Sequence, residues 1–130
     1  MATLNVSLTL TSTDISSDNL SMTVSDALTV VSPTQSNSLV TATATGGDNI
    51  ILPNLDSPRY VYLKHTGLNS AGSSSGTDKV HVETADGTTI MELKINEFAF
   101  FPYYKEGAGL LQLEASANTV QVEYAFFTRG

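Results

Sequence analysis

Residues 79–104 read KVHVETADGTTIMELKINEFAFFPYY, and the rest of the chain is organised around them. Its opening VHV and its later MEL both alternate apolar and polar residues, which is the period of a half-buried strand. Between them stands Asp86-Gly87, a dipeptide typical of a two-residue type I′ turn. Pairing outward from this turn places Val82 opposite Met91, so that the apolar faces of the two strands agree. The stretch therefore predicts a hairpin at the centre of a β-sheet domain.

Short runs with the same alternation recur along the rest of the chain. Turn residues separate them at the spacing typical of a sandwich or jelly roll, and no segment carries a sustained helical stripe of apolar residues. We therefore expect an all-β fold, an antiparallel β-sandwich or jelly roll of about nine or ten short strands, with no substantial helix. The predicted strands lie near residues 4–10, 20–31, 39–45, 50–52, 60–65, 80–83, 91–95, 98–101, 110–113 and 120–126.

Residues 1–48 differ in composition from the rest of the chain. They are rich in Ser and Thr and contain no Lys or Arg, since the first basic residue is Arg59. A polar segment at residues 33–37 predicts a loop within this region. Two interpretations stay open for residues 1–48: an ordinary part of the sandwich, or a separate arm that lies on neighbouring subunits. In both, residues 49–130 form the sandwich body.

Composition narrows the functional classes. The 130 residues are the size of one domain, and 13 acidic residues against 6 basic ones give a net charge of −7. This acidity disfavours binding to nucleic-acid phosphates. The absence of Cys excludes disulfides and thiolate metal sites. Residues 1–20 show neither a basic segment nor an unbroken apolar stretch, and no run approaches about 20 apolar residues. We therefore expect no signal peptide and no membrane helix.

Catalytic and metal-binding motifs are weak. Residues 72–76 read GSSSG and match the hydrolase pattern G-x-S-x-G, which requires a strand before it and a helix after it. Here the motif lies in a Ser/Gly-rich loop at residues 67–76 that we expect to be mobile. Neither His65 nor His81 has metal-ligand spacing, and the hairpin register places His81 opposite Glu92. We therefore expect no catalytic residue, metal site or cofactor.

Adjacent aromatic residues indicate an interaction surface. Neighbours in a regular strand point to opposite faces, so one member each of the pairs 100/101, 103/104 and 126/127 faces outward or meets a partner. An interface between subunits is favoured over a sugar-binding platform. The candidate interface residues, from the first strand and from these pairs, are Leu4, Val6, Leu8, Leu10, Phe101, Tyr103, Tyr104 and Phe127.

The chain resembles small virion structural proteins of tailed bacteriophages over most of its length. The resemblance lies in the Ser/Thr-rich first strands, the acidic balance, the lack of Cys, and the series YVYLKH (60–65), VHVET (80–84), MELKINEFAFFPY (91–103) and VQVEYAFF (120–127). It implies a non-enzymatic capsid decoration (cement) protein on the outer surface of the virion, commonly a homotrimer, that bridges copies of the major capsid protein. The alternatives are a carbohydrate- or receptor-binding module of a phage fibre and a head–tail connector component. No family motif matches position by position, so no binding residue is carried over.

Overall fold

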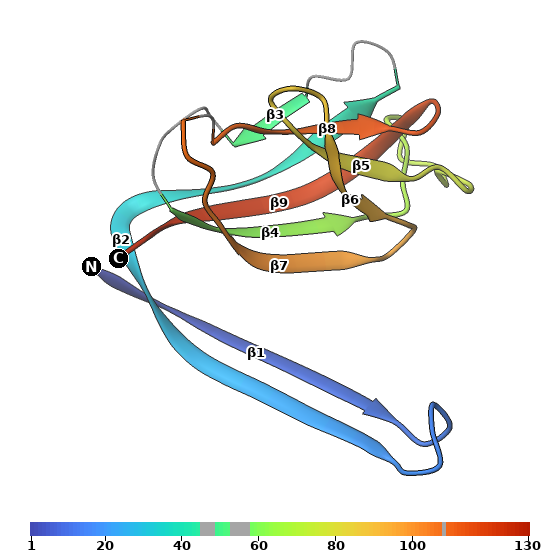
Figure 1. Cartoon of the computed structure of the whole chain (residues 1–130). Helices are drawn as coiled ribbons and strands as arrows, with labels where there is room; N and C mark the ends of the chain where they lie inside the picture. The colour runs from blue at the N-terminus through green and yellow to red at the C-terminus, as the bar shows by residue number, and fades with distance from the viewer. Residues whose placement is uncertain (45–48, 53–57, 108) are drawn as a thin grey trace.

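The computed structural model of the chain describes residues 1–44, 49–52, 58–107 and 109–130. These residues form nine strands and no helix, arranged in two antiparallel sheets (Figure 1). One sheet has the strand order β1-β2-β9-β4-β7, and the other has the order β3-β8-β5-β6. The predicted all-β sandwich is confirmed, whereas a jelly-roll connectivity is not. The strands are β1 (Ala2–Ser12), β2 (Leu20–Thr43), β3 (Asn49–Leu52), β4 (Arg59–His65), β5 (Val80–Thr84), β6 (Thr89–Leu93), β7 (Phe98–Tyr103), β8 (Leu111–Ala115) and β9 (Thr119–Arg129).

The core lies between the two sheets and is mainly aliphatic. Its alternation is clearest in β4, where Val61, Leu63 and His65 are buried while the residues between them are half-buried or exposed. Half-buried aromatic side chains of β7 and β9 pack around its margin. Within the described residues, this cluster contains nothing that precedes Ala42. Its members are Ala42, Ile51, Leu52, Val61, Leu63, Val80, Val82, Leu93, Leu111, Leu113, Ala115, Val120 and Val122.

The register of the β5–β6 hairpin is the predicted one. Val82 pairs with Met91, and the next apolar pair, Val80 with Leu93, follows two residues further from the turn. Val80 and Val82 are fully buried, whereas Met91 is half-buried at the edge of the sheet. The period-two alternation is therefore sufficient to set both the pairing and the buried face.

The turn of this hairpin differs from the predicted type I′ turn. Gly87 has a φ of 80°, but Asp86 does not have the positive φ that a type I′ turn needs at both central residues. Gly87 N donates to Thr84 O at 2.9 Å, and Thr84 N donates to Thr88 O at 3.0 Å, which encloses a three-residue loop with a left-handed glycine. The Asp86 carboxylate accepts hydrogen bonds from the Thr84 hydroxyl and the Thr88 amide. These bonds hold Asp86 in its ordinary conformation and lower its pKa to about 2.

Replacing Gly87 by Val should destabilise the protein by on the order of 1 kcal/mol or more, because a β-branched residue resists positive φ. A Cβ atom at Gly87 meets nothing within 4 Å, so the cost is one of backbone conformation and not of crowding. Urea denaturation measures it, with Gly87→Asn as the matched control, since Asn tolerates this conformation. Equal midpoints for the Val and Asn variants would contradict the assignment of the turn.

Strand β2 is shared between two parts of the molecule. Leu20 to Val30 pair with β1, whereas Gln35 to Thr43 pair with β9. Between these parts β2 advances from Val30 to Gln35 while β9 moves only from Arg129 to Phe127, so β2 carries a large bulge. The strand thus continues through residues 33–37, where the sequence predicted a loop.

The hairpin of β1 and the first part of β2 extends away from the sandwich (Figure 1). We refer to residues 1–31 as the arm and to the remaining described residues as the body. The predicted boundary after residue 48 lies in the segment 45–48, outside the described residues. Strand pairing divides the chain earlier, because residues 35–43 belong to the body sheet and Ala42 lies in its core.

Residues 67–76 form a hydrogen-bonded loop, where the sequence predicted a mobile linker. Ser75 N donates to Gly67 O at 2.9 Å, and the Gln121 side chain donates from Nε2 to Asn69 O at 2.7 Å. The Asn69 carboxamide in turn accepts from two amides of the loop itself. The polar side chains that suggested mobility instead satisfy the backbone of the loop.

Candidate interaction surface

The arm is a two-stranded ribbon whose two faces differ in chemistry. Antiparallel partners share a face, so the pairing of Leu8 with Val24 and of Leu10 with Met22 places these side chains together. Asp26, opposite Val6, interrupts this apolar face. Its apolar members are Ala2, Leu4, Val6, Leu8, Leu10, Leu20, Met22, Val24, Leu28 and Val30.

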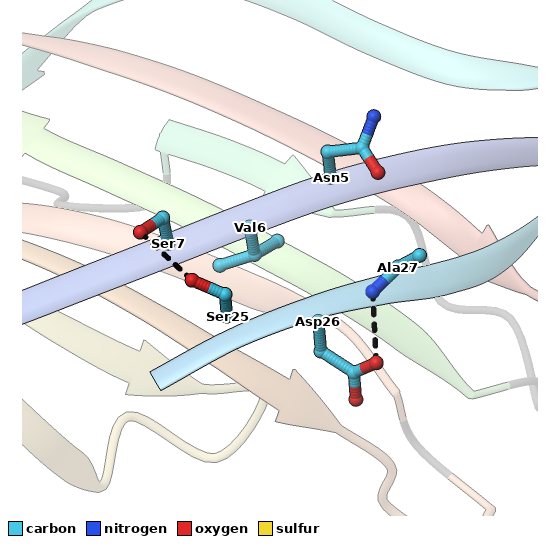
Figure 2. Close-up of a pocket in the computed structure, with 6 residues that line it drawn as sticks. All are labelled: Asn5, Val6, Ser7, Ser25, Asp26 and Ala27. Atoms are coloured by element: carbon cyan, nitrogen blue, oxygen red, sulfur yellow. Dashed lines mark hydrogen bonds between the residues drawn. The ribbon is translucent and has the colours of Figure 1, made fainter. Parts of the chain in front are cut away.

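The opposite face of the arm is formed largely by hydroxyl side chains. Ser7 Oγ lies 3.2 Å from Ser25 Oγ, and Thr9 Oγ1 lies 3.4 Å from Thr23 Oγ1. Figure 2 shows the Ser7 and Ser25 hydroxyls directed toward each other across the ribbon. Such cross-strand pairs stabilise a ribbon by roughly 0.2–1 kcal/mol each. This face can also bond to water, whereas the apolar face has no such compensation.

The bulge in β2 determines which way the apolar face of the arm is directed. Val30, the last residue of that face, pairs with Arg129, and Gln35 pairs with Phe127. Arg129 and Phe127 are two residues apart and so share one face of β9, which is the face opposite to the core residue Val122. The apolar face of the arm is therefore continuous with the outer face of the five-stranded sheet and not with the face that packs on the core.

The outer face of the body sheet is aromatic. The rings of Tyr60 and Phe100 stack with their centroids 6.0 Å apart, and the Arg129 guanidinium lies 5.3 Å from the centroid of the Tyr60 ring. Tyr62 donates a hydrogen bond from its hydroxyl to Glu123 Oε1 at 3.2 Å. Burial, and then the contact with Glu123, raise the pKa of Tyr62 above its ordinary value. This face thus combines large apolar rings with polar groups at its margin.

An open apolar cleft of about 650 Å³ lies between the arm and the body, and we refer to it as the arm cleft. Many of its side chains are exposed: Val24 by 62% on the arm side and Phe98 by 57% on the body side. A smaller hollow of about 380 Å³, where Leu4 and Val6 face Tyr62 and Phe127, lies where the arm joins the body. The apolar residues of the arm cleft are Val6, Leu8, Leu10, Val24, Leu28, Met91, Phe98, Ala99, Phe100 and Phe101.

The candidates of the first strand lie together as the sequence predicts. Leu4, Val6, Leu8 and Leu10 share the apolar face of the arm, and each lines the arm cleft or the adjoining hollow. Leu8 and Leu10 are exposed by 42% and 46%, whereas the two residues nearer the body are half-buried. That these residues contact a partner remains a prediction.

The aromatic candidates are divided between two faces of the sheet. Phe127 is on the outer face and lines the smaller hollow. Phe101 and Tyr103 pack against the core, with their rings edge to face at 6.2 Å, although Phe101 also reaches the arm cleft. Burial raises the pKa of Tyr103. Tyr104 is 54% exposed but does not line the cleft, so these four residues do not form one surface.

Several residues of the cleft were missed by sequence reasoning. Val24 was recognised as part of a strand, yet nothing in one sequence says which strand it pairs with. The predicted interface residues include neither Phe98 nor Phe100, since Phe101 was the candidate from the pair 100/101. One signal was available in the sequence. Tyr60, Tyr62 and Lys64 alternate with the core residues of β4 and so mark its outer face. Phe100 and Phe98 pair with Tyr62 and Lys64 and therefore share that face.

The two histidines have structural roles. His65 is fully buried; its Nδ1 accepts a hydrogen bond from Gly67 N at 3.0 Å, so Nε2 carries the proton and donates to Asp78 O at 2.9 Å. His81 lies 3.3 Å from Glu92, as the hairpin register predicts, and Glu92 also pairs with Lys79 at 3.3 Å. No three His, Cys, Asp or Glu residues among those described are grouped so that they could hold a metal ion.

Comparison of the chain with protein families, with curated protein sequences and with solved structures gave no match. A search of the described residues for a helix with the length and apolarity needed to span a bilayer found none. Among the described residues, the arm cleft is the feature with large exposed apolar side chains on both of its sides.

Proposed function

We propose that this chain is a capsid decoration protein, which stabilises the assembled head of a tailed bacteriophage by attaching to its major capsid protein through the arm cleft. The supporting observation is the exposed apolar face of the arm. Leu10, Met22 and Val24 are each about half exposed or more, at 46%, 54% and 62%. Contiguous exposed apolar surface of this kind marks interaction sites in proteins.

A two-stranded ribbon is marginally stable alone in water, which supports a role for the arm in binding. Most of the arm makes its strand contacts only within itself, since β1 pairs with β2 and with no body strand. Covering its apolar face would bury several Leu and Val side chains, each contributing about 1.5–3 kcal/mol when fully removed from water. The partner surface would thereby stabilise the arm as well as hold it.

Attachment to an assembled shell accounts for stabilisation by mass action. A protein that binds the assembled head and not its separated subunits shifts the equilibrium toward the head by RT ln(1 + [L]/Kd). The acidic body, with its own complete core, would remain outside the shell and keep the protein soluble. No catalytic group is needed for this role.

The double substitution Leu8→Ser and Leu10→Ser should weaken binding to heads by about tenfold to a hundredfold. Both side chains are more than 40% exposed in the free chain, so the change removes roughly 1–3 kcal/mol of apolar burial in the complex and little from the free protein. Co-sedimentation with heads of the encoding phage, prepared without this chain, measures the affinity. The matched control is Thr9→Ala with Thr11→Ala on the hydroxyl face; equal binding by the two double variants would exclude the apolar face as the contact.

A further inference from the structure

Strand β1 leaves one edge of the five-stranded sheet unpaired in the part of the chain that the structure describes. The order β1-β2-β9-β4-β7 places β1 at one end and β7 at the other, and β3 and β6 end the second sheet. Along an antiparallel edge, every second residue directs its N–H and C=O away from the sheet. An open edge of this kind is a template for a further strand.

The sheet edges differ in how well they are protected. Besides the four end strands, the arm part of β2 has an edge of its own before Val30, and this edge carries Asp26. β3 has only 4 residues, and β6 has 5 and includes Glu92. β7 contains Pro102, which has no N–H to donate. β1 has 11 residues, ATLNVSLTLTS, without a charge, a Pro or a Gly. It is therefore the edge that lacks every common device against pairing with another chain.

The sequence of β1 is complementary to itself in an antiparallel pair. With Val6 on a two-fold axis, Leu4 lies opposite Leu8 and Ala2 opposite Leu10; with Ser7 on the axis, Val6 lies opposite Leu8. In both registers apolar residues meet apolar ones and uncharged polar residues meet uncharged polar ones, which is the arrangement that stabilises neighbouring strands. The strand carries no charge, so the pairing brings no like charges together. Asp14 and Asp18 follow the end of β1, and because the two strands are antiparallel, the Asp residues of the two copies lie at opposite ends of the pair.

We infer that β1 pairs edge to edge with β1 of a second copy of this chain, joining two five-stranded sheets into one. The apolar faces of the two arms would then form a single surface twice as long. The contact is two-fold and produces a dimer, whereas the resemblance to phage proteins implies a trimer. The inference goes beyond capsid attachment, because it uses the backbone edge of β1 and leaves the apolar face free.

Single cysteines test this pairing cleanly, because the chain has no Cys of its own. In a two-fold antiparallel pair only the residue on the axis comes within the 4.4–6.8 Å between Cα atoms that a disulfide requires, because the next residue is already about 8 Å from its copy. Of Asn5→Cys, Val6→Cys, Ser7→Cys and Leu8→Cys, a single variant should form disulfide-linked dimers efficiently under mild oxidation. Leu39→Cys, on an exposed position of the body, is the control. Failure of all four variants to cross-link above this control would overturn the pairing.

A charge at the edge provides the second test. Ser7→Lys places two like charges at the centre of the pair and should convert the dimer to a monomer by light scattering, while Ser7→Thr should remain a dimer. Circular dichroism verifies that both variants are folded. A wild-type monomer or trimer, or an unchanged mass for Ser7→Lys, would overturn the inference. The same variant distinguishes failure of the β1 pairing from failure of the proposed function. The mass of Ser7→Lys in solution reports on the β1 pairing, and its co-sedimentation with phage heads reports on capsid attachment.

Discussion

Deletion of residues 2–28 should abolish binding to phage heads and leave the body folded. The deleted segment holds the apolar face of the arm, yet it contributes no member to the hydrophobic core described between the sheets. Thr29 and Val30 are retained because Gly130 N donates to Thr29 O at 2.9 Å and Val30 pairs with Arg129. Removing β1 alone would leave the first part of β2 without a partner strand, so the whole hairpin is removed.

Three measurements assess the deletion. Circular dichroism should retain the β-sheet spectrum, urea unfolding should give a free energy within about 1 kcal/mol of the full chain, and co-sedimentation with heads should fall to background. Unfolding of the truncated protein would show that the arm is integral to the sheet. Co-sedimentation at the level of the full chain would move the contact to the outward aromatics of the body, of which Tyr104 is 54% exposed.

The pairing of the β5–β6 hairpin is a part of the fold that the sequence alone can predict. Local alternation is sufficient where both strands of a pair are adjacent in sequence, as for Val82 and Met91, because the turn fixes the register. It is not sufficient for the detail of the turn. Asp-Gly is compatible with a type I′ turn and with a type I turn followed by a left-handed glycine. The structure has the type I turn with the left-handed Gly87, in which Asp86 accepts hydrogen bonds from Thr84 and Thr88.

The division between arm and body could not be predicted, because it depends on a bulge. Residues 1–48 share one composition, yet Leu8 lines a cleft while Ala42 lies in the core. The number of residues in the bulge between Val30 and Gln35 decides whether the apolar face of the arm is continuous with the outer face or with the core face of the sheet. A one-residue difference there would direct the same apolar side chains to the opposite face of the sheet.

The hydrogen-bond partners of buried polar groups could not be predicted from the sequence either. His65 alternates with Leu63 in β4, so its burial follows from the period of the strand, but its hydrogen bonds do not. Both bonds come from the loop at residues 67–78, through Gly67 N and Asp78 O. The loop that appeared to be a linker therefore also completes the core, because a buried imidazole without partners would destabilise the fold.

Leu113→Ala should destabilise the protein by about 2–5 kcal/mol, the largest stability effect that we expect of a single substitution. Leu113 has no exposed surface and lies in the middle of the four-stranded sheet, paired with Asn49 on one side and Val82 on the other. Truncation there leaves a cavity that β-strands fixed on both sides cannot close.

The matched control is the same chemical change in the arm. Leu10→Ala removes the same atoms from a side chain that is 46% exposed and outside the core, so urea unfolding should change by less than about 1 kcal/mol. The two variants should reverse their order in the binding assay: Leu113→Ala should still co-sediment with heads at temperatures where it is folded, and Leu10→Ala should bind more weakly than the unaltered chain. Equal destabilisation by both substitutions would mean that the arm packs on the body in solution, with its apolar face already covered in the free protein. In that case the apolar face could bind a partner only after the arm had moved away from the body.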